Sequence, residues 1–424
     1  MKKSDYFFIF YYFLLLFVLQ MQQSETMPSL ALRMGFVIAV MWPLYSVKKE
    51  LMPVIICLFF TVTNYNFSYS YMPYEVYQYD IMIAVGLFIG YRRSSLINKS
   101  LPSILIIMLI LVTIINGVTE YKILYITYSI MGIIFLWPFM KYGDAKMLRL
   151  MSWGFITAGS VLAINFLLFG RNYLDIYYAG GGFEREGWSD PNYFGCAVGF
   201  GIVAALVEIF RRKSSAIIKL ILYASIMVML ACLAINASRG ALLAVGISSI
   251  ILISFSRTKT MYKILFTIII VAGIISIFNM GYFDLLQYRI ENDSNGGSGR
   301  LIIWTRKIQS FFNEANILNI FFGMGNEGAR ALAFGSAVSR AFHNDFIAFL
   351  CEYGFLGLIL YLGWLYYPVK KAKENKLIVA SVVGYIAACG LTLEPVTAGR
   401  FTYFIFWIYA VQIAVCRNVE IGRK

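Results

Sequence analysis

The only histidine of the chain lies where a long polar stretch meets an apolar one. His343 stands in the run 340–346, RAFHNDF, and an apolar segment follows it. No other side chain has an unperturbed pKa near 7, the value that suits a general base at neutral pH. The position therefore predicts a catalytic base at a boundary between water and lipid. An interfacial or helix-capping histidine is the structural alternative.

Arginines near this junction and beside apolar segments supply positive charge. Arg239 lies between two apolar segments with almost no loop, where an arginine is costly unless it is paired, snorkels or serves a function. Arg185 stands beside two glutamates. The polar stretch before His343 carries further basic residues: Arg289, Arg300, Arg306, Lys307, Arg330 and Arg340. Each alone suits ordinary loop surface, but guanidinium groups bind phosphate oxygens in pairs. We therefore predict a phosphate-bearing lipid as the ligand.

Polar residues at the starts of two apolar segments are further candidates for the site. Asp190 and Asn192 flank a proline, which predicts a helix start, and Asn344 follows His343. Helix capping is the alternative role for Asp190. Glu352 comes nine residues after His343, about 180° around a helix. A structural hydrogen bond suits Glu352 at least as well as catalysis.

Metal and cofactor sites are not indicated by the sequence. The glycine run 323–328, GMGNEG, lacks the preceding strand and the Lys-Ser/Thr pair of phosphate-binding loops, so it predicts a flexible turn. No carboxylate cluster suits a metal-dependent glycosyltransferase, and a lone histidine disfavours a zinc site. The six cysteines have no paired spacing and suit apolar packing. We expect neither a metal nor an organic cofactor.

The composition is that of an all-α polytopic membrane protein. Hydrophobic residues make up 60% of the 424 residues and charged residues 14%, against about half and a quarter in soluble domains. The opening segment lacks a small-residue cleavage site, so we expect a retained span. At roughly 20 residues a span, about 14 transmembrane helices are predicted, at 6–22, 30–46, 51–66, 79–91, 101–116, 121–140, 148–169, 191–210, 216–236, 240–256, 262–280, 344–367, 377–393 and 399–416.

The charge pattern predicts the orientation of these spans. The net charge of +14 comes from basic clusters at every second loop, so it reflects the positive-inside rule and argues against nucleic-acid binding. Both termini are then cytoplasmic, and residues 281–343 form a large periplasmic loop with short helices inside a single membrane domain, 1–424. A helix is predicted from Arg300 to Phe312, lying on the membrane or over a cavity. Glu394-Pro395, before Arg400, is expected to close the same outer cavity.

Motifs within residues 180–360 resemble the O-antigen ligase and polymerase superfamily. They are, in family order, DPNYF at 190–194, SRG at 238–240, RLIIW at 300–304, GMG at 323–325, and HNDF at 343–346 running on to EYGFLG at 352–357. The resemblance implies a GT-C-like, metal-independent, inverting glycosyltransferase of the bacterial inner membrane, with its active site facing the periplasm. Its donor would be a saccharide on undecaprenyl diphosphate. The essential residues of the family map to Arg185, Arg239 and His343, with Arg171 competing for the first place.

The implied reaction assigns a role to each group. A hydroxyl of the acceptor sugar attacks the anomeric carbon, His343 takes or orients its proton, and Arg239 and Arg185 neutralise the departing diphosphate. Arg300 and Arg340 hold sugar or phosphate oxygens. The remaining predicted substrate contacts are Arg289, Asp190, Asn192 and Asn344.

Three functions share this donor. A polymerase joins lipid-linked repeat units, and the span number, the aromatic-rich sequence and the long loop favour it. A ligase transfers the glycan to the lipid A core. A flippase for the same lipid is the alternative from a different class. The expected partners are the lipid-linked oligosaccharide, membrane lipid, and for a polymerase a chain-length regulator and a flippase.

Overall fold

The structure is a computed structural model in which all described secondary structure is helical. It describes residues 3–21, 30–46, 51, 54, 55, 57, 58, 145–170, 191–211, 215–236, 238–255, 300–332, 341–393 and 401–416. The predicted spans 79–91, 101–116, 121–140 and 262–280 lie outside these residues, as do most of 51–66 and residues 281–299 of the predicted loop. Within the described ranges, the predicted all-α class is confirmed.

The predicted spans that fall on described residues coincide with helices. These are α1 (Lys3–Met21), α2 (Leu30–Ser46), α7 (Ala145–Asn165) with its π-helical extension η2 (Phe166–Gly170), α9 (Pro191–Arg211), α10 (Ala216–Ile235), α11 (Arg239–Phe255), α17 (Asp345–Lys371), α18 (Lys376–Thr392) and α19 (Phe401–Val415). By length and composition, four segments of the described chain can cross a membrane: Ala145–Leu168, Asn192–Phe210, Ala216–Ile235 and Asp345–Lys371. The other five helices are shorter apolar segments. The described chain is therefore that of a helical membrane protein, while the number of 14 spans stays a prediction.

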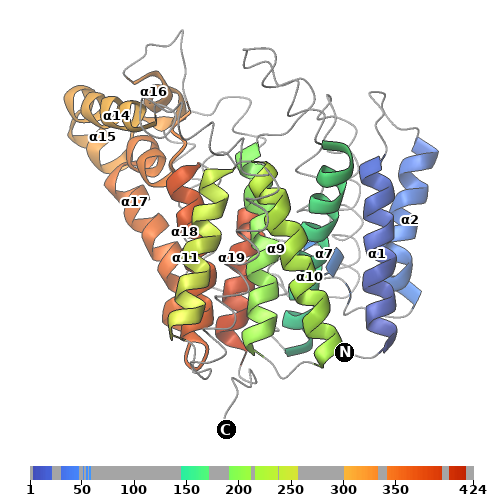
Figure 1. Cartoon of the computed structure of the whole chain (residues 1–424). Coiled ribbons are helices and arrows are strands. Elements are labelled where there is room, and N and C mark those ends of the chain that lie inside the picture. The colour runs from blue at the N-terminus through green and yellow to red at the C-terminus, as the bar shows by residue number, and fades with distance from the viewer. Residues whose placement is uncertain are drawn as a thin grey trace.

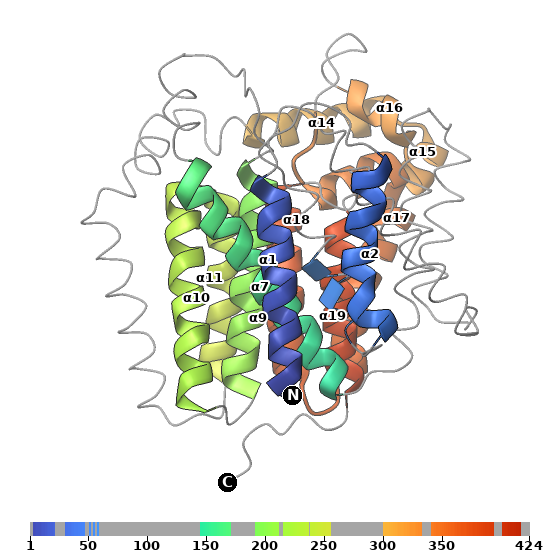
Figure 2. The same ribbon diagram turned by 90° about the vertical axis from the view of Figure 1, so that its right-hand side faces the viewer.

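Three short helices lie at one end of the bundle. They are α14 (Arg300–Glu314), α15 (Ile317–Phe322) and α16 (Gly325–Ala331), and Figures 1 and 2 show them on one side of this end, next to the start of α17. We call this end the loop end. Helix α1 begins and helix α19 ends at the opposite end of the bundle (Figure 1). The helix predicted over 300–312 is confirmed, and it runs two residues further, to Glu314.

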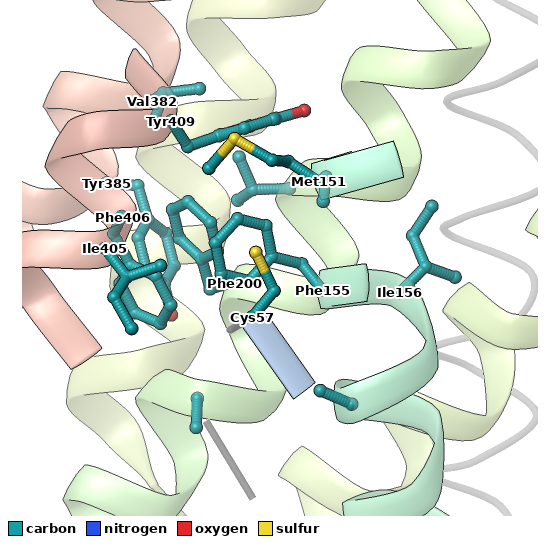
Figure 3. Close-up of a cluster of buried hydrophobic side chains, with 14 of the residues drawn as sticks. Cys57, Met151, Phe155, Ile156, Phe200, Val382, Tyr385, Ile405, Phe406 and Tyr409 are labelled. Atoms are coloured by element: carbon teal, nitrogen blue, oxygen red, sulfur yellow. The ribbon is translucent and has the colours of Figure 1, made fainter. Parts of the chain in front are cut away.

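Aromatic side chains fill the centre of the bundle (Figure 3). Phe200 of α9 stacks on Phe406 of α19 with ring centroids 3.6 Å apart, and Phe155 of α7 meets Phe200 edge-on at 4.7 Å. Tyr385 of α18 and Tyr409 of α19 close the group, and both lie within 5.8 Å of Phe200. We call these five residues the aromatic core. Since lipid tails are as apolar as the side chains, such packing, rather than exclusion of water, holds membrane helices together.

Small and hydroxyl side chains set the distances between the long helices. A Cβ on either Gly159 or Gly201 would lie 3.1 Å from the Cα of the other, so α7 and α9 meet backbone to backbone. Ser248 of α11 and Ser381 of α18 share a hydrogen bond of 2.7 Å between their hydroxyls. These contacts align α11 with α18, and the ends of both helices build the candidate site.

Helix α17 is broken at Gly354, where the loop helices dock. Gly354 has a φ of 68° and a non-helical ψ of −168°, and Gly323, just after α15, has a φ of 84°. A Cβ on Gly323 would overlap the backbone of Glu352, and one on Gly354 would overlap the backbone of Phe321. The Met324 N–H donates to the Cys351 carbonyl at 3.0 Å. The run 323–328, predicted to be a flexible turn, is therefore a tightly packed contact that leads into α16.

Candidate functional site at the loop end

The last turn of α18 is the point where the candidate site assembles. Residues 391–393 offer three carbonyls, and each accepts a hydrogen bond from a segment far away in the sequence. The Asn344 side chain donates to Leu391, the Arg300 guanidinium to Thr392, and the Asp345 N–H to Leu393, at 3.3, 2.6 and 3.0 Å. We call residues 391–393 the hub. It lies just before Glu394, which the sequence had placed near the outer cavity, although residues 394–400 themselves lie outside the described residues.

Arg239 begins helix α11 directly beside the hub. The Cβ of an alanine at Gly240 would lie 2.5 Å from the Thr392 hydroxyl, so only glycine lets this turn approach α18 so closely. The preceding Ser238 is fully buried and touches the first turns of α9, because a Cβ on Gly195 would lie 2.6 Å from it. The motif SRG therefore uses serine and glycine to pack, and it leaves the half-buried Arg239 at the helix start.

His343 occupies a strained position at the start of helix α17. Its φ of 51° makes it the only non-glycine residue with positive φ among the described residues. Such a conformation costs of order 1–3 kcal/mol and persists where the surroundings over-determine it. Asn344 supplies part of that constraint, because its Oδ1 accepts from the Phe346 and Ile347 N–H groups at 2.9 and 3.2 Å. The structure thus gives Asn344 a capping role, and its predicted contact with substrate stays a prediction.

Arg300 and Trp304 attach helix α14 to the site. Arg300 holds the hub through Thr392, and the Trp304 indole N–H donates to the Phe342 carbonyl at 2.7 Å. Phe342 precedes His343, so α14 reaches both sides of the site. The hydrophobic spacing of α14 predicted the helix, but not this indole contact.

The site brings positive charge to one place. Helices α11, α14 and α17 all begin beside the hub, and a helix N-terminus carries about half a positive charge. Arg239, Arg300 and His343, which the sequence analysis selected from separate motifs, lie at or next to these three starts. The arrangement suits an anion with several oxygens, such as a diphosphate.

Two basic residues interpreted as loop surface have other roles, which corrects the prediction. Lys307 is 0% exposed, and its ammonium donates to the carbonyls of Ala329, at 3.1 Å, and of Arg330. The Arg330 side chain, 28% exposed, lies 3.9 Å from the fully buried carboxylate of Glu352. Lys307 lies on the same side of α14 as Phe311, and both side chains are buried. Lysine is rarely buried, so its residue type had pointed to the surface of the loop.

The other predicted site residues are placed only in part. Arg185, Asp190, Arg289 and Arg340, and the competing Arg171, lie outside the described residues. Asn192 is half-buried in the first turn of α9. Within the described ranges, no group of three or more His, Cys, Asp or Glu side chains could hold a metal ion.

Comparison with known families identifies part of the chain. Residues 224–362 match the family model described as O-antigen ligase. This segment of the chain is therefore similar to the O-antigen ligase family. The predicted resemblance to the O-antigen ligase and polymerase superfamily is therefore confirmed. No curated protein matches the chain significantly.

The matched segment, residues 224–362, contains the central residues of the site. It runs from within α10 to within α17, and so includes Arg239, Arg300 and His343. The hub and the predicted upstream motif 190–194 lie outside it. The family implies a glycosyltransferase-like enzyme that acts on lipid-linked oligosaccharide in O-antigen and lipopolysaccharide pathways, and the helices are those of a membrane protein.

Proposed function

We propose that this protein is an O-antigen polymerase, an inverting glycosyltransferase that joins repeat units carried on undecaprenyl diphosphate. One observation carries the proposal. The base candidate His343 and the cations Arg239 and Arg300 come from three separate motifs, yet they surround one hub at the loop end. A base beside several cations suits a transfer whose leaving group is a diphosphate.

The proposed reaction is a single displacement at the anomeric carbon of the donor sugar. The acceptor hydroxyl oxygen forms a bond to that carbon, and the bond from the carbon to the diphosphate oxygen breaks. The hydroxyl proton passes to the His343 imidazole, as in general-base catalysis. Attack opposite the leaving group inverts the anomeric configuration.

The cations act on the leaving group. Arg239 stands at the start of α11, where the helix adds its own partial charge, and stabilises the diphosphate as negative charge develops on it. Arg300 is held by the Thr392 carbonyl and supplies a second cation at the hub. Arg185 and Arg340 complete the proposed set of cations, and the electrostatic work falls to these side chains without a metal.

The orientation is part of the proposal. The loop end faces the periplasm of the bacterial inner membrane, and both termini are cytoplasmic, following the basic clusters in the sequence. Gln309 is exposed on α14, and all six native cysteines are buried. A Gln309→Cys variant should therefore react with a membrane-impermeant maleimide in cells whose inner membrane is intact. Labelling only after the inner membrane is permeabilised would show that the loop end faces the cytoplasm, and would contradict the proposed orientation.

The main experiment separates polymerase from ligase. The family description, O-antigen ligase, supports the ligase as the second candidate. Purified protein in liposomes receives lipid-linked repeat units, with and without lipid A core. We expect banded polymer from repeat units alone, also in the presence of EDTA. Core modification without polymer would identify a ligase, and movement of the lipid without transfer would identify a flippase.

A further inference from the structure

The strained backbone of His343 is held from both sides. On one side, Phe342 receives the Trp304 N–H at its carbonyl, 2.7 Å away. On the other side, Asn344 caps α17 and the Asp345 N–H binds the hub at 3.0 Å. Since a positive φ in a residue with a side chain needs such constraints, the groups that fix Phe342 also determine where the imidazole lies.

A buried ammonium fixes the ring of Phe342. The Lys307 Nζ lies 4.7 Å from the centroid of that ring, in cation–π contact. The same ammonium binds the carbonyls of Ala329 and Arg330 at the end of α16. A lysine that is 0% exposed is stable only with such partners. Lys307 therefore joins α14, the end of α16 and the residue before His343.

An ion pair joins the end of α16, to which Lys307 is bound, to helix α17. Arg330, whose carbonyl binds Lys307, places its guanidinium 3.9 Å from Glu352. Glu352 lies on α17 within the segment that docks against Gly323 and Met324. Around these charges, a small set of buried side chains forms a separate outer core: Phe311, Ala329, Leu332, Phe342, Ala348 and Cys351.

We propose that Lys307, Arg330, Glu352 and Trp304 are positioning residues that hold His343 in its catalytic conformation. This inference rests on the proposed function, in which His343 is the base. Lys307 and Trp304 hold Phe342, and the Arg330–Glu352 pair holds the α16 carbonyls to which Lys307 is bound. Loss of either link lets residue 343 relax toward an ordinary negative φ and moves the imidazole away from the acceptor hydroxyl.

The test uses the fact that the chain has one histidine. Full-length protein without a histidine tag, labelled with ¹⁵N-histidine and reconstituted in liposomes, gives the imidazole signals of His343 alone in solid-state NMR. The variants are Lys307→Met and Trp304→Phe, which remove the ammonium and the indole N–H. The control is Arg306→Met, because Arg306 is exposed on the same helix. Arg330→Lys, which keeps the charge facing Glu352, is the conservative variant.

We expect Lys307→Met and Trp304→Phe to shift the His343 signals and to lower kcat about tenfold to a hundredfold. The KM for the lipid-linked donor should change less than twofold, because Arg239 and Arg300 remain. Arg306→Met should leave the signals and kcat unchanged, and Arg330→Lys should keep at least half of kcat. Unchanged signals in both folded variants would overturn the proposal, as would a loss confined to KM.

Failure of the proposed function gives a different result. If His343→Ala retains full activity, the base role of His343 fails, whatever the NMR signals show. If His343→Ala is inactive while folded Lys307→Met and Trp304→Phe have wild-type kcat, the base role stands and the positioning role fails. Should Lys307→Met not fold, Trp304→Phe decides, because it keeps an aromatic side chain at that position and removes only the donor.

Discussion

The aromatic core and the outer core are held together by different forces. In the aromatic core, rings from α7, α9, α18 and α19 stack and meet edge-on, and Figure 3 shows them interleaved. The outer core contains few large side chains and depends on Lys307, Arg330 and Glu352 in and around it. The aromatic core is mostly ring packing, with the Tyr385 and Tyr409 hydroxyls hydrogen-bonded to Cys196 and Ser152 of neighbouring helices, whereas the contacts of the outer core are dominated by charged side chains and main-chain carbonyls. The comparison indicates that the aromatic core holds the long helices together, whereas the outer core fixes the positions of residues at the loop end.

The sharpest test of this contrast removes the reacting groups without disturbing either core. His343→Ala and Arg239→Ala should each lower the polymerisation rate about 10² to 10⁴-fold, the range for a lost base or charge stabiliser. Arg239→Lys should fail as well if paired contact with the diphosphate matters. The measurement is the polymer ladder in a polymerase-null strain, read together with membrane abundance. A normal ladder from His343→Ala would contradict the role of His343 as general base. A ladder that disappears only because the protein is missing from the membrane would show that His343 has a structural role.

The next largest effect should come from the close contact between the end of α15 and α17, where Gly323 and Gly354 lie. Gly354→Ala forces a side chain into a positive φ and against the Phe321 backbone, so it should destabilise the loop end by at least about 3 kcal/mol. Limited proteolysis of residues 300–332 would report it. Gly363→Ala is the matched control in the same helix, with no atom within 4 Å of the added methyl. Equal protease resistance of the two variants would show that this contact tolerates movement.

A smaller effect is expected from the ion pair. Arg330→Ala leaves the buried Glu352 carboxylate without its cation, which should cost about 1–2 kcal/mol. This value lies below the usual cost of breaking a buried pair because Arg330 is partly exposed. Thermal unfolding in detergent should show the loss, while Arg306→Ala stays close to wild type. If the two variants unfold at one temperature, the pair contributes nothing to the outer core.

The smallest effect should appear inside the membrane bundle. Ser381→Ala removes its hydroxyl contacts with Ser248, at 2.7 Å to the hydroxyl and 3.0 Å to the carbonyl. Hydrogen bonds between membrane helices average about 0.6 kcal/mol, so stability should fall by that order and activity should hold. Denaturation in mixed micelles is the measurement. A loss of activity in Ser381→Ala would contradict the view that contacts within the bundle hold the helices together without determining the positions of the site residues.

The sequence predicted the helices better than their contacts. Long apolar runs gave the described spans to within a few residues, because a helix in lipid must satisfy its own backbone. Arg239, Arg300 and His343 were predicted as site residues because each breaks an apolar pattern or belongs to a motif. In the structure each lies on a segment that contacts the hub, and their roles in a site stay predictions. The hub could not be predicted from the sequence, because it accepts its hydrogen bonds through main-chain carbonyls, which every residue has. Lys307 and Arg330 were misjudged because their environment depends on how α14 and α16 fold onto α17.

The hub also determines when the site can form during synthesis. Gly240 meets Thr392 across 152 residues of sequence (392 − 240), and Arg300 meets it across 92. A growing chain can insert α9, α10 and α11 and complete the loop helices while the carbonyls that join them do not yet exist. Contacts so distant in sequence slow folding, because the entropy of closing a long loop must be lost before the contact forms. Assembly of the hub therefore waits for residues 391–393, and a chain that ends before residue 391 contains Arg239, Arg300 and His343 but lacks the carbonyls that join their helices.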